Sequence, residues 1–263
     1  MPAPHPTRPP RLYAHRGASA EAPENTLPSF LCALAIPGVD AIELDVHLTR
    51  DGHPVVSHDP TALRMANRNV AWKDIDLAEA RTFDMGWGFV APDGSRPFAG
   101  QGIQIPTFEE VLATLRQVVL NVDIKRAWPP LVERMVQLIR ARDAEQRVVL
   151  ASFHLSSLLA VRALRYQGDT ALSRQEVLAL LTTPRALLRH APLFGTCAQI
   201  PEQSGPLRFA KSAFIDKCHA LGIRVDFWTV NDPQRARELL ALGADGIMTD
   251  DPRALAPVFL SGR

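Results

Sequence analysis

Polar residues that could act on a phosphate ester stand at the ends of three strand-like runs. The first run ends in His15-Arg16-Gly17, the second contains Glu43-Leu44-Asp45, and the third ends in Asp123-Ile124-Lys125. A period of two directs both charged side chains of each of the last two motifs to one side of a strand. A further pair, His58-Asp59, follows a short extended run. If the fold brings these ends together, two histidines, three carboxylates and two cations share one site.

The carboxylates of these motifs could hold a metal ion. Glu43, Asp45 and Asp123 supply hard oxygen ligands, which suit one divalent cation, Mg²⁺ or Ca²⁺, rather than zinc. Cavity size and the number of bound waters decide between the two ions, and the sequence shows neither. The alternatives are solvated hairpin charges for the first two and a salt bridge from Asp123 to Lys125 or Arg126.

The basic residues suit a phosphate ester. Arg16 and Lys125 can contact a phosphoryl group, and the alternative for each is an ion pair with a neighbouring carboxylate. His15 and His58 titrate near neutral pH, as a general acid and a general base should. Gly17 would let the backbone approach the phosphate closely. With the metal, these residues predict hydrolysis or transfer at a phosphate ester.

Strand-like and helical patterns alternate along the chain and must position these residues. We predict strands at Arg11–His15, Ala41–Val46, Val119–Ile124, Arg147–Ser152, Thr170–Leu172, Cys197–Ile200, Arg224–Trp228 and Gly246–Met248. Helical patterns lie between them, from Thr26–Ala35 to a last helix that starts near Pro252. Eight such units in about 250 residues favour a closed parallel (β/α)₈ TIM barrel. Reactive side chains in such a barrel lie at the C-terminal ends of the strands, where the motifs above are found.

One strand-like run, His53–His58, breaks this alternation. It follows Ala41–Thr49 through Arg50-Asp51-Gly52, and Asp-Gly between two extended runs predicts a hairpin. Strands of a hairpin are antiparallel, so we expect this run to form an arm over the barrel rim rather than a barrel strand. Residues 59 to 106 lack a βα rhythm and are predicted to form a lid. The domain prediction is therefore a Pro-rich tail at 1–10 and a single barrel domain at 11–263, with an insertion at about 47–106.

Composition excludes several classes of protein. The 263 residues are 46% hydrophobic with a formal net charge of +1, which excludes a disordered chain and argues against nucleic acid as a partner. No apolar run approaches the ~20 residues of a transmembrane segment, and the N-terminus lacks the apolar core of a signal peptide. Cys32, Cys197 and Cys218 are widely spaced, as free thiols in a reducing compartment would be, so we predict a cytoplasmic protein.

Two further residues near the motifs are not expected to take part in the reaction. Asn25, before Thr26-Leu27-Pro28, is predicted to be the N-cap of the first helix. His47 shares the strand face of Glu43 and Asp45, but we expect it to lie beyond the barrel rim and leave it out of the metal site.

Further motifs accompany these residues in a fixed order. They are His15-Arg16-Gly17-Ala18-Ser19, Pro23-Glu24-Asn25-Thr26, residues 43–52, Val55-Val56-Ser57-His58-Asp59, Asp123-Ile124-Lys125, Ala151-Ser152-Phe153, Phe227-Trp228-Thr229-Val230-Asn231 and residues 243–250. Over roughly Tyr13 to Pro252, this series resembles the glycerophosphodiester phosphodiesterase family. The resemblance implies a (β/α)₈ barrel with a small insertion after the second strand. It also implies metal-dependent hydrolysis of glycerophosphodiesters to sn-glycerol 3-phosphate and an alcohol.

The resemblance also implies roles for individual residues. It implies His15 and His58 as the catalytic acid and base, Glu43, Asp45 and Asp123 as metal ligands, Arg16 and Lys125 at the phosphate, and Trp228 in the pocket for the glycerol or the alcohol. Position 123 is commonly Glu in the family, and Asp is one methylene shorter. That departure affects the expected coordination of the metal more than the expected reaction.

Other functions remain open at this point. A lysophospholipase D would perform the same chemistry on a lipid, and Trp72, Trp87, Phe89 and Phe98 could give the lid an apolar surface for an acyl chain. A non-catalytic barrel that only binds phosphodiesters is disfavoured by the two histidines and the carboxylate pair. We expect a small-molecule glycerophosphodiester as substrate and a monomer or homodimer. The preferred head group, the histidine that starts as base, and the choice between cyclic phosphate and direct water attack are not decided by the sequence.

Overall fold

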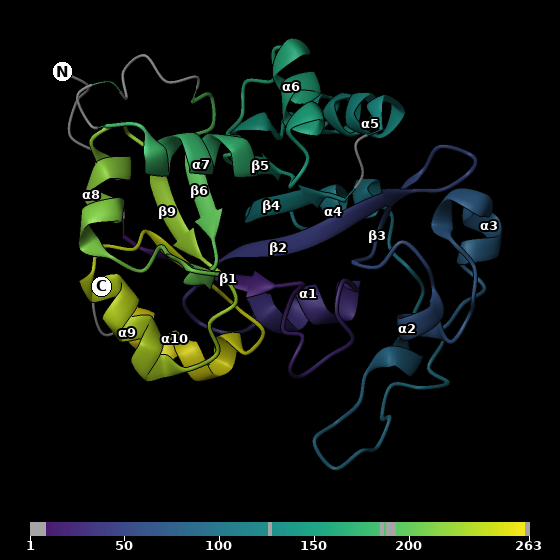
Figure 1. Ribbon diagram of the computed structural model, residues 1–263. Coiled ribbons are helices and arrows are strands. Elements are labelled where there is room, and N and C mark those ends of the chain that lie inside the picture. The colour runs from purple at the N-terminus through teal and green to yellow at the C-terminus, as the bar shows by residue number, and fades with distance from the viewer. Residues whose placement is uncertain (1–8, 126–127, 185–186, 188–192, 261–263) are drawn as a thin grey trace.

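The computed structural model describes residues 9–125, 128–184, 187 and 193–260, and a parallel sheet runs through its centre (Figure 1). Its strands are β1 (Arg11–His15), β2 (Val39–Leu48), β4 (Val119–Ile124), β5 (Val148–Ala151), β6 (Cys197–Ile200), β9 (Arg224–Phe227) and β10 (Gly246–Thr249). They are hydrogen-bonded in the order β5-β4-β2-β1-β10-β9-β6, and every ladder on this path is parallel.

The eighth position of the barrel is filled by two bridging residues. Thr170 pairs with Leu150 of β5, and Ala171 pairs with Cys197 of β6, both in parallel. Because each bonds to a different neighbour, no continuous ladder forms, and the predicted strand Thr170–Leu172 is present only as this bridge. The bridge joins the two edge strands and closes a ring of eight positions. The predicted (β/α)₈ barrel is confirmed.

Helices cover the outside of this ring (Figure 1). They are α1 (Leu27–Leu34), α4 (Phe108–Thr114), α5 (Pro129–Arg140), α6 (Leu155–Ala163), α7 (Arg174–Thr182), α8 (Ser212–His219), α9 (Pro233–Ala241) and α10 (Pro252–Leu260), with a short 3₁₀ turn η3 (Glu145–Arg147) before β5. A small antiparallel pair, β7 (Gln203–Ser204) and β8 (Leu207–Arg208), follows β6. Thr107 and Ser173 begin α4 and α7 with capping boxes, in which side chains satisfy the first amides of the helix.

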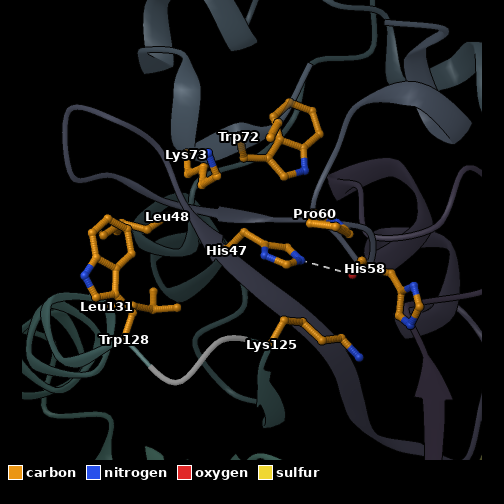
Figure 2. Close-up of a pocket in the computed structure, with 10 residues that line it drawn as sticks. His47, Leu48, His58, Pro60, Trp72, Lys73, Lys125, Trp128 and Leu131 are labelled. Carbon is orange, nitrogen blue, oxygen red and sulfur yellow. Dashed lines mark hydrogen bonds between the residues drawn. The ribbon is translucent and has the colours of Figure 1, made fainter. Parts of the chain in front are cut away.

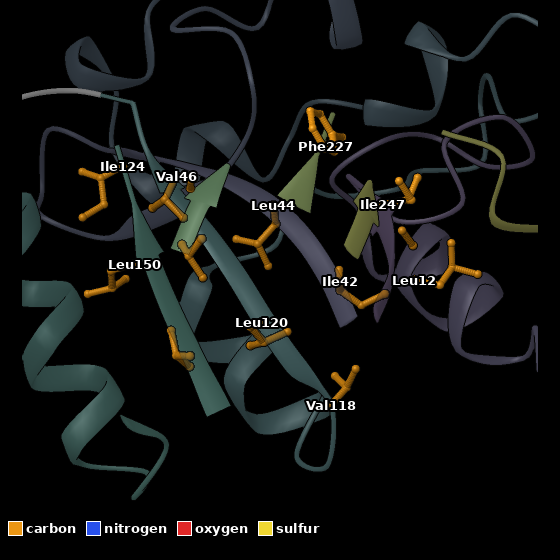
Figure 3. Packing of buried hydrophobic residues seen from close by; sticks show 14 of the residues in the cluster. Leu12, Ile42, Leu44, Val46, Val118, Leu120, Ile124, Leu150, Phe227 and Ile247 are labelled. Carbon is orange, nitrogen blue, oxygen red and sulfur yellow. The ribbon is translucent and has the colours of Figure 1, made fainter. Parts of the chain in front are cut away.

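Strand periodicity divides the buried side chains between two cores. Leu12, Ile42, Leu44, Leu120 and Phe227 point outward and pack between the strands and the helices (Figure 3). The alternate residues point into the barrel, where a separate cluster includes Tyr13, Ala41 and Met248. Toward the C-terminal ends of the strands, the inward positions carry the polar residues of the candidate site.

The insertion begins with the predicted hairpin. β3 (Pro54–Val56) pairs antiparallel with the end of β2, and Gly52 takes a positive φ of 84° in the turn between them. After the hairpin come α2 (Leu63–Ala66), η1 (Trp72–Asp74), α3 (Leu77–Ala80) and η2 (Met85–Gly88). These elements share a small core of their own around Trp72 and Met85. The expected arm and insertion after the second strand are confirmed, whereas the domain limits remain predictions.

The aromatic residues of the insertion mostly contact one another or the core. Trp72 is 1% exposed, and Phe89 packs edge to face on Phe98 with ring centroids 5.0 Å apart. The guanidinium of Arg96 lies over the ring of Trp87 at 4.1 Å. Within the described ranges, no helix combines the length and the apolar character needed to cross a membrane.

Candidate active site

Strand register brings the predicted residues together at one mouth of the barrel. His15 of β1 lies opposite Glu43 of β2, and Asp45 lies opposite Asp123 of β4. All four occupy inward positions at the C-terminal ends of adjacent strands, and Lys125 follows directly after β4. The register therefore places four of the eight predicted site residues side by side.

Lys125 joins two of the buried carboxylates. Its Nζ lies 2.7 Å from Oδ1 of Asp45 and 2.8 Å from Oδ2 of Asp123. Burial alone would raise the pKa of Asp45, but the cations of Lys125 and Arg16 outweigh it and hold that pKa low. Burial and the nearby charge of Asp45 raise the pKa of Glu43 to about 8. The site thus confines one ionised carboxylate beside one that holds its proton near neutral pH.

The carboxylate set has the chemistry that a hard divalent cation requires. Oδ1 of Asp123 is buried and has no hydrogen-bond partner, and burial raises the pKa of this carboxyl. A cation would relieve the mutual repulsion of the three acids and supply the missing partner. In the part of the chain that is described, however, no group of three or more His, Cys, Asp or Glu side chains is arranged to hold a metal ion. Lys125 stands between two of the proposed ligands instead.

His15 is oriented by two carboxylates. Its Nδ1 lies 2.6 Å from Oδ1 of Asp250, and its Nε2 lies 3.7 Å from Oε2 of Glu43. Burial lowers the pKa of His15, but Glu43 and the hydrogen bond with Asp250 outweigh burial, so the net pKa is raised. Asn231 and Ser19 donate hydrogen bonds that hold Asp250 in place. Sequence reasoning missed the orienting role of Asp250, although a carboxylate directly after the last strand signals a residue at the same mouth.

His58 reaches the mouth from the insertion. Its Nδ1 lies 2.8 Å from Oδ1 of Asp59, whose other carboxylate oxygen accepts a hydrogen bond from Nε of Arg64 at 2.6 Å. Nε2 of His47 donates to the carbonyl of His58 at 3.1 Å, and Nε1 of Trp72 donates to the carbonyl of Asp59 at 2.9 Å. These bonds fix the backbone of His58 between β2 and η1. As expected, His47 lies in the arm: the ladder of β2 with β4 ends at Val46, and His47 pairs with Val55 of β3, where the returning hairpin buries its side chain.

Arg16 is held by carboxylates at the same mouth. Its Nη1 donates to Oε1 of Glu24 at 3.1 Å, and its Nε lies 3.3 Å from Oδ2 of Asp45. Burial lowers the pKa of Arg16, but Asp45 and Glu24 outweigh burial and raise it. The guanidinium is therefore charged and ion-paired, and its contact with phosphate remains a prediction.

Asn25 has a different task from the one predicted. It takes a positive φ of 58°, and its Nδ2 donates to Oδ2 of Asp45 at 2.8 Å. Thr26 caps α1 in its place. The prediction that Asn25 is the N-cap is wrong because the left-handed turn directs its amide toward β2, where it satisfies a buried carboxylate. A left-handed Asn is compatible with this turn, since its short polar side chain tolerates that region.

Trp228 stands across the mouth from Lys125. In the closed ring, β9 lies four positions from β4 in either direction, so the residues that follow the two strands face each other across the opening. The half-buried indole packs beside the inward cluster of Tyr13 and Met248 and meets Phe153 edge to face, with centroids 5.9 Å apart. Its role toward glycerol remains a prediction.

Comparison with known proteins shows the family of this chain. The profile of the Glycerophosphoryl diester phosphodiesterase family matches residues 15–254. The chain belongs to this family. A glycerophosphodiester phosphodiesterase of Caldanaerobacter subterraneus subsp. tengcongensis is 32% identical over 260 residues, which cover 95% of this chain and 98% of the relative. The predicted family, the barrel and the assignment as a phosphoric diester hydrolase are thereby confirmed.

Two other similar proteins differ in the activity that their names state. The solved structure of an Oleispira antarctica phosphodiesterase in complex with the product sn-glycerol-3-phosphate is 25% identical, with a TM-score of 0.76 over 95% of this chain and 96% of that one. A lysophospholipase D of Homo sapiens is 28% identical over 266 residues, which cover 92% of this chain and 83% of the relative. Both the main prediction and its lipid alternative therefore have counterparts among similar proteins.

Proposed function

We propose that this chain hydrolyses glycerophosphodiesters to sn-glycerol 3-phosphate and an alcohol, with His15 and His58 as the acid–base pair. The observation that carries the proposal is the pairing of each histidine with its own carboxylate, Asp250 at 2.6 Å and Asp59 at 2.8 Å. In both cases Nδ1 makes this contact, so Nε2 is the nitrogen that can exchange a proton with a substrate. The names of the Caldanaerobacter enzyme and of the Oleispira product complex support the same substrate class.

The reaction requires one proton to be removed and one to be supplied. One histidine takes a proton from the nucleophile, and the other gives a proton to the oxygen of the leaving alcohol. The nucleophile is either water or the neighbouring glycerol hydroxyl, which would give a cyclic phosphate that water then opens. Arg16 and Lys125 would meet the phosphate, and each must first give up a carboxylate contact.

The metal part of the proposal concerns Glu43, Asp45 and Asp123. A divalent cation, Mg²⁺ or Ca²⁺, held by these residues would neutralise charge on the phosphate. The orphaned Oδ1 of Asp123 and the raised pKa of Glu43 support such an occupant. Trp228, across the mouth, would line the glycerol side of the pocket.

The proposal also covers the substrate size, the oligomeric state and the cell compartment. We infer a small-molecule substrate and a monomer or homodimer. The three cysteines Cys32, Cys197 and Cys218 are free thiols, which supports action in the reducing cytoplasm.

The decisive experiment measures release of sn-glycerol 3-phosphate from glycerophosphoglycerol with Mg²⁺ or Ca²⁺, and again with EDTA. We expect metal-dependent release that disappears in the H15A/H58A double variant. A parallel reaction with lysophosphatidylcholine tests the lipid alternative, and faster turnover of that lipid would replace the proposed substrate class. Binding of phosphodiesters without product from either substrate would make the chain a non-catalytic barrel.

A further inference from the structure

A cavity opens between the barrel mouth and the insertion. Its volume is about 390 Å³, and it is lined by His47, Leu48, His58, Pro60, Ala71, Trp72, Lys73, Lys125, Trp128 and Leu131 (Figure 2). These residues come from the end of β2, from the chain after β3, from η1 and the residue before it, and from the start of α5, together with Lys125 and Trp128. A cavity of this size accommodates a small organic group.

The cavity adjoins the proposed reaction centre. It shares His58 and Lys125 with the residues proposed to handle the proton and the phosphate. Trp228 follows β9, which lies opposite β4 in the ring, so this cavity and Trp228 lie on opposite sides of the mouth. A phosphodiester has two arms on its phosphorus. If Trp228 contacts the glycerol arm, the cavity is the place for the other alcohol.

The lining shows which alcohols fit. Six of the ten residues are apolar: Leu48, Pro60, Ala71, Trp72, Trp128 and Leu131. The others are two lysines and two histidines, and none of the described residues that line the cavity is a carboxylate. Lys73 pairs with Asp74, which is not part of the lining, and both side chains are about half exposed. Such an exposed pair offers little attraction to a second cation.

We propose that this cavity binds the leaving alcohol and selects an uncharged alcohol with a hydrocarbon portion over a cationic one such as choline or ethanolamine. The inference rests on the proposed function and adds its substrate class. In the step concerned, the bond between phosphorus and the alcohol oxygen breaks, and that oxygen gains a proton. A nucleophile oxygen forms the new bond to phosphorus, and water supplies the hydroxyl group of the final phosphate monoester. The cavity acts by burying the hydrocarbon of the departing group.

One feature of the lining argues for the opposite preference. Two tryptophans could attract a quaternary ammonium group through their ring faces. The ring of Trp72 is almost fully buried, however, and its N–H is bonded to the carbonyl of Asp59. The carboxylates nearest the lining are already paired, Asp45 and Asp123 with Lys125 and Asp74 with Lys73, so they offer little attraction to a cationic alcohol. The balance favours the uncharged alcohol.

The test compares sn-glycero-3-phosphocholine with its carbon isostere, the 3,3-dimethylbutyl ester of sn-glycerol 3-phosphate. The two leaving groups have nearly the same shape and differ in charge. We expect kcat/KM for the uncharged ester to exceed that for the choline ester by at least roughly tenfold, the scale on which single contacts discriminate substrates. Equal values or a preference for choline would overturn the inference while leaving the phosphodiesterase activity established. No release of sn-glycerol 3-phosphate from either ester or from glycerophosphoglycerol would overturn the proposed function as well.

A change of charge at one lining residue tests whether this cavity sets the preference for the uncharged alcohol. Lys73→Glu places a carboxylate in an exposed position of the lining, so the ratio of the two kcat/KM values should shift toward choline by roughly tenfold. Lys211→Glu is the matched control, because Lys211 is exposed and does not line the cavity. The control should keep the wild-type ratio. A ratio that is unchanged in Lys73→Glu, or that changes equally in both variants, would show that the lining does not set the selectivity.

Discussion

Removing the charge of Asp250 should change the pH at which the enzyme works. Asp250→Asn keeps the size of the side chain and its ability to accept the 2.6 Å hydrogen bond from Nδ1 of His15. A hydrogen bond to a charged partner is worth about 1.5–3 kcal/mol and one between neutral groups about 1 kcal/mol. The difference is therefore about 0.5–2 kcal/mol. Because the Asp250 side chain is 39% exposed and solvent screens it, we take a value in the lower half of this range, about 1 kcal/mol.

This free energy corresponds to a change in the pKa of His15. Since a pKa change of one unit corresponds to about 1.4 kcal/mol, the pKa of His15 should fall by about 0.7. The sign follows from charge: a carboxylate stabilises the imidazolium, and its removal favours the neutral ring. The limb of the pH profile that belongs to His15 therefore moves to lower pH, whether this residue acts as acid or as base.

The assay is kcat/KM for a glycerophosphodiester between pH 4 and 10, since this ratio reports the ionisations of the free enzyme. Asp251→Asn is the matched control, because it removes the same charge one residue away and Asn can still begin α10 as Asp251 does. The control should leave both limbs in place. A profile of Asp250→Asn that superimposes on the wild type, or an equal shift in the control, would refute the orienting role of Asp250.

The remaining expectations concern the proton transfers, the metal and stability. His15→Ala and His58→Ala should each lower kcat by roughly 10²–10⁴, and the double variant should be far less than multiplicatively worse; a single variant with near wild-type kcat would remove that histidine from the mechanism. Asp123→Asn should weaken Mg²⁺ or Ca²⁺ binding strongly in a calorimetric titration, whereas Asp123→Glu should retain it; unchanged affinity in the Asn variant would leave Asp123 only its salt bridge. Glu176 accepts hydrogen bonds from Ser173 and from Arg162, and although burial raises its pKa, these bonds and that of Phe194 lower it overall. Because its folded pKa lies below the unfolded value, its contribution to stability is fully present above about pH 4.5 and is lost as the pH falls through the folded pKa. Glu176→Gln should therefore cost roughly 2 kcal/mol at pH 7 and less near pH 3 in urea unfolding, and an equal loss at both pH values would contradict this.

The barrel was predictable because its signals are local and repeated. Each strand carries a period-two pattern or an apolar run, and Asp51-Gly52 marks the one place where the chain turns back on itself. Thr170 and Ala171 were harder to classify, because a two-residue bridge between strands has no periodicity of its own. Its neighbours β5 and β6 define it more than its own sequence does.

The partners of the site residues were less predictable than the residues themselves. Asp250 and His15 are 235 positions apart in the chain, and Asp45 is bonded to Asn25 through a left-handed turn. Neither contact follows from the residue types alone, because each depends on a backbone conformation or on closure of the barrel. The hydrogen bond from His47 to the carbonyl of His58 likewise depends on the return of the hairpin.

The charges at the mouth link phosphate binding to cation binding. Asp45 and Asp123 hold the ammonium of Lys125, and Asp45 also holds Nε of Arg16. The same two carboxylates are proposed metal ligands, so a cation that binds them competes with Lys125 and Arg16. Release of those two basic side chains would then leave them available to a phosphate, whose negative charge they match. The carboxylates would thus bind the cationic side chains in the free protein and release them when metal and substrate bind together. This exchange is a reason for a buried site to carry acids and bases in nearly equal number.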